Sequence, residues 1–192
     1  LEDLSFALPF DVAGGLNILA GILTLFLLKE TLTKEDRKEK HNLNIFEQIK
    51  KLFESGTLKF FNIVMVIFTS MISGVQVFFG IWLNESFQFT AQSIGLFWGI
   101  SGIVMTVVQL NVARFFTPRK ALIVGFGVYG VSVIFLLIAE HLLNISVVII
   151  AFAVMTIGTA MILPSINSRL SLEGKKNQQG LLLGISQSMG SL

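Results

Sequence analysis

The sequence predicts an all-α transmembrane protein, and the first evidence is its composition. Of its 192 residues, 53% are hydrophobic and 14% charged, with a mean hydropathy of +0.78. An ordinary soluble domain has roughly a quarter of its residues charged. A globular protein of this size has too small an interior to bury so many apolar side chains. Lipid is therefore the expected solvent for most of the chain.

The second observation is a set of apolar runs long enough to cross a bilayer. We expect five full spans and the start of a sixth, together with one amphipathic helix in a polar segment. A helix of about 20 residues rises about 30 Å, which matches the hydrocarbon core. The expected spans cover about residues 9–28, 60–83, 91–115, 121–139 and 145–165, and the incomplete one covers 180–192.

The third observation is where the cations lie. All 14 Lys and Arg residues fall within or beside three polar segments, 29–59, 114–120 and 169–179. The polar stretches between the other span ends hold none. Positively charged loops remain in the cytoplasm, so these three segments are expected on the cytoplasmic side. The same segregation makes topology, rather than nucleic-acid binding, the reason for the net charge of +2.

The first span begins with Pro9, which suits a first helical turn because its missing N–H would have been unpaired there. Asp11 is the one acidic residue in this run. It lies within a turn of the outer end, where an interfacial aspartate is favoured over a proton-carrying site.

The polar segment 29–59 has two parts. Residues 34–41 are nearly all charged and are expected to be flexible. Residues 43–54 alternate apolar and charged side chains at helical spacing. We expect an amphipathic helix there, on the membrane surface or against the inner face of the protein. The apolar positions are Leu43, Phe46, Ile49, Leu52 and Phe53.

Catalytic chemistry is disfavoured. The chain has no cysteine, which excludes disulfides and thiolate metal sites. Its two histidines, His41 and His141, fall in expected polar loops, so neither a metal site nor a cofactor is predicted. Apart from Asp11 the spans hold no acidic residue or histidine to activate a nucleophile. A membrane-embedded enzyme or a scaffold remains the alternative from a different class.

Two amides and two aromatic residues are the candidates for a substrate cavity. Gln76 and Gln109 lie inside spans, where a buried amide must be hydrogen-bonded. Each either meets substrate in a water-filled cavity or ties two helices together, and the sequence leaves both interpretations open. Phe79 and Trp98 are candidates for an apolar cavity wall, with lipid-facing rings as the alternative.

Other polar and small residues in the spans are expected to serve structure. Asn62 and Asn167 lie near cytoplasmic ends and are predicted to be interfacial. We expect three threonines, Thr69, Thr106 and Thr156, to bond their own backbone. Glycines at short spacing are expected to let helices approach closely: Gly95, Gly99, Gly102, Gly125, Gly127, Gly130, Gly180 and Gly184.

Three stretches carry a family resemblance that covers essentially the whole chain. They are PFDVAGGLNILAGILTLFLLKET, IWLNESFQFTAQSIGLFWGISGIV and LPSINSRLSLEGKKNQQGLLLGISQSMGSL. They resemble the major facilitator superfamily, and in particular the drug:proton antiporter branch that includes bacterial tetracycline exporters. The match corresponds to that family's helix six through the beginning of helix eleven. Lys29 replaces a proline in the family's Leu-Pro-Glu-Thr-like ending of helix six.

The turn NVARFFTPRKAL occupies the place of the family's loop motif, Gly-x-Leu-Ala-Asp-Arg-x-Gly-Arg-Arg. The residues of this degenerate motif are Val112, Ala113, Arg114, Phe116, Arg119 and Lys120. Arg114 stands at the aspartate position and the glycines are missing, which argues against a charge-relay or gating role. Met105 stands nearest to the helix-eight histidine of tetracycline exporters, which argues against their proton path in this half.

The resemblance implies two six-helix bundles around a central cavity that opens alternately to each side. Residues 1–29 would be the last helix of the first bundle, 30–59 the central cytoplasmic loop, and 60–192 an incomplete second bundle. The implied function is proton-coupled efflux of hydrophobic or amphiphilic small molecules by a monomer in the bacterial inner membrane. Carboxylates in helices one to five would carry the protons. A sugar or metabolite facilitator of the same superfamily is the alternative.

Overall fold

The computed structural model describes residues 8–27, 55–173 and 179–190. Within these ranges the chain forms helices joined by short turns and no strand, which confirms the all-α prediction. Four of the helices are long and apolar enough to cross a membrane: α3 (Gly56–Phe87), α4 (Ala91–Phe115), α5 (Pro118–Leu142) and α6 (Ile145–Glu173). The predicted amphipathic helix at 43–54 lies outside the described residues.

Helix α1 (Leu8–Leu27) belongs to one compact unit and helices α3 to α7 to another, so α1 is described by itself. Asp11 lies in its first turn. Its two uncharged polar side chains turn back onto the helix: Asn17 Nδ2 donates to the Ala13 carbonyl and Thr24 Oγ1 to the Ala20 carbonyl, both at 2.8 Å. Bonds of this kind satisfy polar groups in an otherwise apolar helix without help from another element.

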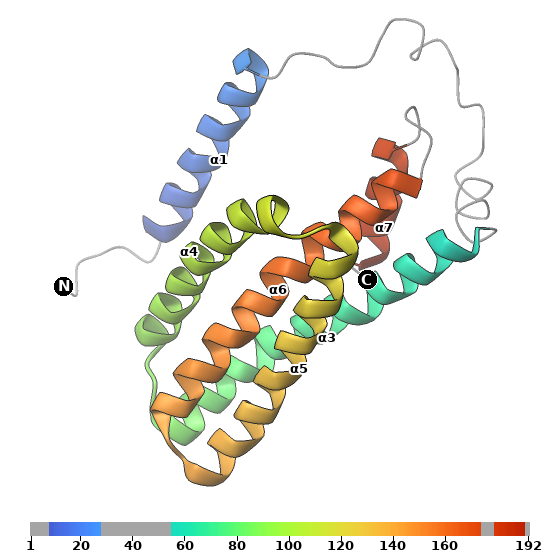
Figure 1. Cartoon of the computed structure of the whole chain (residues 1–192). Helices are drawn as coiled ribbons and strands as arrows, with labels where there is room; N and C mark the ends of the chain where they lie inside the picture. The colour runs from blue at the N-terminus through green and yellow to red at the C-terminus, as the bar shows by residue number, and fades with distance from the viewer. Residues whose placement is uncertain (1–7, 28–54, 174–178, 191–192) are drawn as a thin grey trace, which may run out of the picture. The chain divides into compact units, whose positions relative to one another are not determined.

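Helix α6 is the centre of the second unit. It packs against α3, α4, α5 and the shorter α7 (Gln179–Gly190), as Figure 1 shows. It contributes more buried side chains than the other long helices, whereas in α4 Val112 alone is buried among the described side chains. Fully buried anchors of this core include Phe68, Leu83, Val148, Ile162, Ile166 and Leu170. Large apolar residues cover the outer faces, as expected for a surface in contact with lipid.

Helix α4 begins and ends at the residues predicted for its span, but the other long helices extend beyond theirs. The connections, residues 88–90 and 143–144, are shorter than the predicted spans leave room for, because the polar residues at the span ends are helical. Gln88 (φ 56°) and Leu143 (φ 46°) adopt the left-handed conformation that commonly closes a helix. The expectation that His141 lies in a loop is therefore wrong, since it lies in the last turn of α5.

Short-range hydrogen bonds begin the helices after these tight turns. The Thr90 hydroxyl accepts from the Ser93 backbone N–H at 3.3 Å, and Asn144 Oδ1 accepts from the Ser146 N–H at 2.9 Å. Each side chain thereby pairs one of the backbone N–H groups left free at a helix start. Helix α6 then continues through Pro164 to Glu173, beyond the end predicted at 165. Proline is tolerated inside membrane helices because neighbouring groups satisfy the freed carbonyl.

Helices α5 and α6 make a close crossing through two glycines. A Cβ on Gly158 would lie 2.9 Å from the Tyr129 backbone nitrogen, and one on Gly125 would lie 2.9 Å from Ile162 Cγ1. The predicted role of glycine in close helix packing is confirmed at Gly125. Within the described ranges, the other predicted glycines have no neighbouring atom within 4 Å of an added Cβ, so for them that role stays a prediction. Gly158 was not among the predicted positions.

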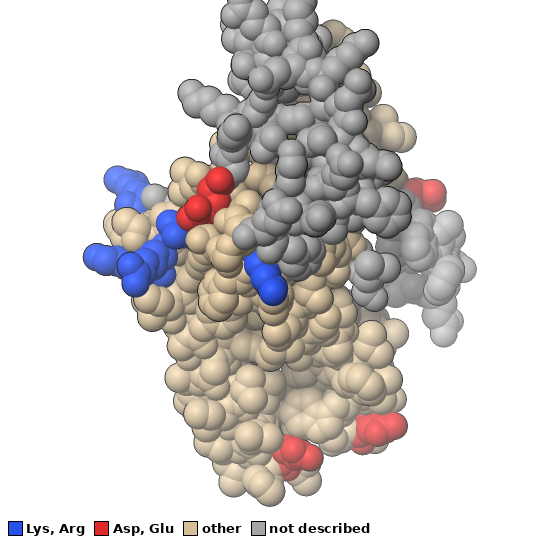
Figure 2. Space-filling model, turned by 90° about the vertical axis from the view of Figure 1, so that its right-hand side faces the viewer, with Lys and Arg blue, Asp and Glu red and all other residues tan. Residues whose placement is uncertain are grey.

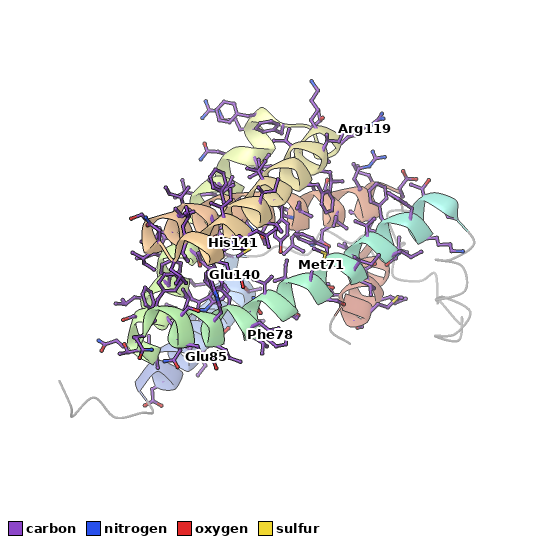
Figure 3. All side chains as sticks on the ribbon, turned by 90° about the horizontal axis from the view of Figure 1, so that it is seen from below. Met71, Phe78, Glu85, Arg119, Glu140 and His141 are labelled. Atoms are coloured by element: carbon purple, nitrogen blue, oxygen red, sulfur yellow. The ribbon has the colours of Figure 1, made fainter. Side chains whose placement is uncertain are left out.

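Charge separates along the helices of the second unit. Figure 2 shows Lys and Arg gathered toward one end, where acidic side chains also lie, whereas the opposite end shows acidic side chains without Lys or Arg. In Figure 3, Arg119 at the start of α5 lies far from Glu85 near the end of α3 and from Glu140 near the end of α5. The two ends of the bundle are therefore electrostatically different, as one fixed orientation across a membrane requires.

Candidate functional site: a cavity between four helices

A cavity of about 260 Å³ lies between α3, α4, α5 and α6, and we call it the Gln76 pocket. Helices α3, α4 and α6 each supply residues three or four positions apart, which place side chains on one helical face, and α5 supplies one residue. From α4 these are Trp98, Ser101, Gly102 and Met105. The remaining lining residues are Ile72, Val75 and Gln76 of α3, Tyr129 of α5, and Phe152, Met155, Thr156, Thr159 and Leu163 of α6.

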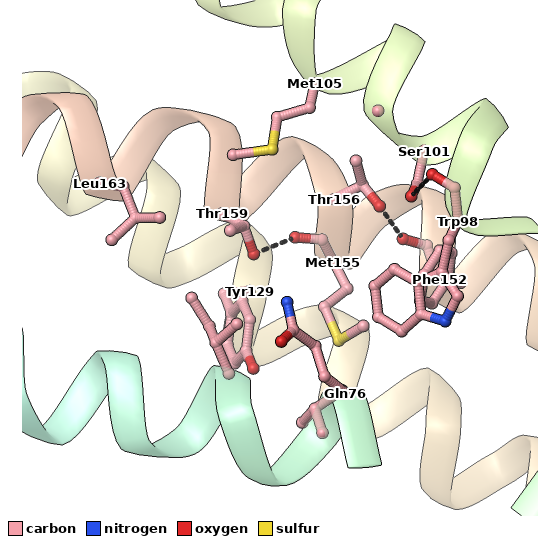
Figure 4. Close-up of a pocket in the computed structure, with 13 residues that line it drawn as sticks. Gln76, Trp98, Ser101, Met105, Tyr129, Phe152, Met155, Thr156, Thr159 and Leu163 are labelled. Carbon is pink, nitrogen blue, oxygen red and sulfur yellow. Dashed lines mark hydrogen bonds between the residues drawn. The ribbon is translucent and has the colours of Figure 1, made fainter. Parts of the chain in front are cut away.

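Gln76 is the polar group that α3 supplies. Figure 4 shows its amide pointing into the space between Tyr129 and Met155. Among the described residues its side chain has no hydrogen-bond partner, so there it does not tie α3 to another helix. An amide carries two N–H donors and a carbonyl acceptor, so Gln76 offers both kinds of hydrogen bond to a molecule in the pocket.

Three hydroxyls line the walls formed by α4 and α6. Ser101 donates to the Trp98 carbonyl at 2.8 Å, Thr156 to the Phe152 carbonyl at 2.9 Å, and Thr159 to the Met155 carbonyl at 3.0 Å (Figure 4).

The prediction that Thr69, Thr106 and Thr156 bond their own helix backbone is confirmed. Thr69 donates to the Met65 carbonyl and Thr106 to the Gly102 carbonyl, as Thr156 does to the Phe152 carbonyl.

Aromatic rings support one wall of the pocket. Phe152 stacks on Phe79, with ring centroids 4.7 Å apart and an interplanar angle of 11°. Trp98 meets the same Phe152 ring edge-on at 5.1 Å, and Phe97 lies at 4.8 Å. Phe79 is 6% exposed and does not line the Gln76 pocket, so it acts on that pocket through Phe152. It lines a separate cavity of about 270 Å³ between α3 and α5.

The structure brings Gln76 and Trp98 together but places Gln109 elsewhere. Gln109 is exposed and lines a smaller cavity of about 170 Å³ near the turn between α4 and α5, together with Val112 and Phe116. Gln76 and Gln109 therefore do not share a site in the described part of the chain.

The degenerate loop motif forms this turn. Val112 is buried against Ala121 and Met161, whereas Arg114, Arg119 and Lys120 are exposed. The Phe116 backbone N–H donates to the Val112 carbonyl at 2.9 Å and closes α4. The side chain of Ala113 lies outside what the structure describes. The motif thus combines a packed apolar residue with three cations facing outward.

The expectation that Asn62 is interfacial is wrong, whereas the interfacial position of Asn167 stays a prediction. Asn62 is 1% exposed and accepts a hydrogen bond from the Ser186 hydroxyl at 2.6 Å, which joins α3 to α7. Asn167 Oδ1 is buried, with no hydrogen-bond partner among the described residues. Position along a span predicts depth in the membrane, but only packing decides whether a side chain faces a neighbouring helix.

Tyr129, Phe152 and Thr159 are pocket residues that sequence reasoning missed. A signal was present for α6, because Phe152, Met155, Thr156 and Thr159 follow one helical face. No such signal pointed to Tyr129. Tyr129 reaches the pocket because α5 crosses α6 closely, with Gly158 of α6 packed against the Tyr129 backbone.

The Gln76 pocket has the composition of a binding site for a small apolar molecule. None of the described residues that line it is Asp, Glu, Lys, Arg or His. Nowhere in the described ranges do three or more metal-ligating side chains cluster. Aromatic and sulfur-containing side chains supply contact area, while one amide and several hydroxyls supply orientation, which is typical of ligand pockets.

The comparisons with known proteins give one finding. A family model described as the Major Facilitator Superfamily matches residues 1–192. No curated protein and no solved structure matches the chain.

Proposed function

The chain belongs to the Major Facilitator Superfamily, whose members are secondary membrane transporters, and from this premise we propose that it carries hydrophobic or amphiphilic small molecules and binds them at the Gln76 pocket. Together with the four membrane-length helices, the family makes the chain an integral membrane protein with a small-molecule substrate. We propose further that transport is efflux by alternating access, coupled to protons.

The observation that carries the proposal is the composition of the pocket. Its walls combine Trp98, Phe152 and Tyr129 with two methionines, and the lining residues that the structure describes include no ionised side chain. Flexible methionines and broad aromatic faces accommodate apolar molecules of varied shape. Such walls favour a hydrophobic substrate over a sugar, because each hydroxyl of a sugar needs a polar partner.

Gln76 is proposed to contact the substrate, and Gln109 is not. The amide of Gln76 points into the pocket and lacks a partner among the described residues. Gln109 lies at a separate, smaller cavity near the basic turn. Gln76 is exposed within the chain, and a ligand in the Gln76 pocket would supply hydrogen bonds to its amide where the membrane excludes water.

Proton coupling needs a carboxylate that changes its protonation during transport. In the described helices the carboxylates stand near helix ends: Asp11, Glu85, Glu140 and Glu173. The proposal therefore assigns proton carriage to residues beyond the described ranges. It also places the protein, as a monomer, in a bacterial inner membrane, with segments 29–59, 114–120 and 169–179 in the cytoplasm.

The test compares two matched substitutions in the full-length transporter. Gln76→Leu removes the amide from the pocket, and we expect efflux of a lipophilic dye from energised vesicles to fall about tenfold, because a buried hydrogen bond to substrate is lost. Gln109→Leu makes the same chemical change outside the pocket and should leave efflux within about twofold of wild type. Equal efflux by both variants would remove Gln76 from the proposal.

The alternatives give different outcomes in the same vesicles. A sugar or metabolite facilitator would equilibrate labelled sugar across the vesicle membrane and would not transport the dye. A scaffold would show no substrate-dependent flux, and a membrane-embedded enzyme would convert the dye chemically. Collapse of the proton gradient should stop dye efflux if coupling to protons is correct.

A further inference from the structure

We infer that the Gln76 pocket prefers ligands that donate hydrogen bonds, and that the oxygens of Ser101, Thr156 and Thr159 set this preference. The inference rests on the proposed function and narrows its substrate class to aromatic molecules with a hydroxyl or amine N–H. Aromatic ethers of the same shape would be poorer ligands, and anions poorer still.

The preference follows from where the hydroxyl protons go. A serine or threonine hydroxyl has a single proton and two lone pairs. In all three residues that proton is donated to a backbone carbonyl of the same helix, at 2.8 to 3.0 Å. The lone pairs of the three oxygens remain free to accept. These hydroxyls, which come from α4 and α6, can therefore accept a hydrogen bond from a ligand but cannot donate one.

The rest of the lining favours the same class. The flat faces of aromatic rings are the negative part of their quadrupole, and Trp98, Tyr129 and Phe152 border the pocket. The lining residues in the described part of the chain include no Lys, Arg or His to neutralise an anion. The amide of Gln76 can donate, as can the Tyr129 hydroxyl and the Trp98 indole. These donors do not convert the pocket into an anion site, because moving a charge from water without a counter-charge is costly.

Burial makes the acceptors selective. Thr156 is 8% exposed, and Ser101 and Thr159 are part-buried. A ligand hydroxyl that loses water on entering the pocket regains a partner there and avoids the penalty of an unpaired donor. The matching ether brings no donor and gains no such bond. One hydrogen bond of ordinary strength corresponds to a preference of about fivefold.

The experiment measures equilibrium binding of two radiolabelled probes, 2-naphthol and 2-methoxynaphthalene, to the purified chain in lipid nanodiscs. Binding to empty nanodiscs is subtracted, so that partitioning into lipid does not contribute. The two probes share one ring system and differ in a single O–H. We expect wild type to bind the naphthol about fivefold more tightly.

The decisive variant is Thr156→Val with Thr159→Val, which keeps side-chain shape and removes both oxygens. Its preference for the naphthol should fall below about twofold. Thr106→Val is the matched control, because Thr106 bonds the Gly102 carbonyl at 2.9 Å on α4 but does not line the pocket. It should retain the wild-type preference. Thr159→Val alone should show part of the loss, and it isolates this pocket, because Ser101 and Thr156 also border a neighbouring cavity of about 350 Å³.

A rescue variant separates chemistry from packing. Thr156→Ser with Thr159→Ser keeps both oxygens and loses the methyl groups, so the preference should persist even if overall affinity falls. An unchanged preference in the double valine variant would overturn the inference, and so would the absence of binding of either probe to wild type. Neither result bears on the dye efflux of Gln76→Leu, so failure of the preference and failure of the transport proposal are distinguishable.

Discussion

The hydroxyl of Ser186 donates to Asn62 Oδ1 at 2.6 Å, and both side chains are fully buried between α7 and α3. Asn62 completes the arrangement by donating its amide N–H to the Leu58 carbonyl at 2.8 Å. Further along α7, Gly190 packs so closely against Thr69 that an added Cβ would lie 3.0 Å from the threonine oxygen. A buried hydrogen bond and a close steric contact therefore hold α7 against α3.

Ser186→Ala should destabilise the protein by roughly 0.5–1.5 kcal/mol, because it leaves Asn62 Oδ1 buried without a donor. The measurement is thermal unfolding in detergent, followed by circular dichroism. Ser188→Ala is the control: Ser188 is exposed and donates to the Gly184 carbonyl of its own helix. Combining Ser186→Ala with Asn62→Ala should cost less than the sum of the single changes. Strict additivity would show that the bond contributes nothing.

Gly158→Ala should destabilise the crossing of α5 and α6 by about 1–3 kcal/mol, because overpacking there forces backbone to move. The nearest atom to the added Cβ would be the Tyr129 backbone nitrogen at 2.9 Å, which cannot rotate away. Gly127→Ala on α5 has no atom within 4 Å of its Cβ and should be neutral or slightly stabilising. The same unfolding assay compares the two. Equal stability of both variants would contradict the crossing described above.

Phe152→Ala should cost about 3 kcal/mol and also weaken ligand binding, because its ring packs on Phe79, Phe97 and Trp98 and lines the Gln76 pocket. Phe78→Ala is the counterpart on the outer face of α3, where the ring is 70% exposed (Figure 3). Its loss should shift unfolding far less. Probe binding to Phe152→Leu tests the wall separately from folding, since leucine refills most of the space.

The absence of cysteine from the chain permits a direct test of orientation. Single cysteines at Lys120→Cys and Glu140→Cys stand at opposite ends of α5. In intact cells, a membrane-impermeant maleimide should label Glu140→Cys and spare Lys120→Cys until the membrane is opened, as the positive-inside rule requires. Labelling of Lys120→Cys in intact cells would reverse the assigned orientation.

Much of the fold was predictable because its cause is local. Apolar runs of spanning length have to be helical in lipid, since backbone groups have no other partner there. Helix α4 accordingly begins at Ala91 and ends at Phe115, as its span was predicted to do. The threonines that bond their own helix were equally predictable, because the partner carbonyl lies three or four residues away. His141 was misplaced because hydropathy detects the apolar core of a span and not its polar final turn.

The candidate site was only partly predictable. Gln76 and Trp98 stood out as polar or aromatic residues within spans, but hydropathy could not show that they share a cavity while Gln109 lies outside it. Tyr129 could not be found from the sequence, because its place in the pocket depends on how closely α5 crosses α6. The partner of Asn62 lies 124 residues away along the chain.

The sequence by itself determined the solvent, the helices and the separation of charge, because each depends on the hydropathy and charge of neighbouring residues. Only the tertiary structure decided which faces meet, which polar groups are paired and where a cavity remains. Those outcomes depend on contacts between helices far apart in the chain, such as Gly158 against the Tyr129 backbone and Ser186 against Asn62. Side-chain packing, unlike hydropathy, has no local signature.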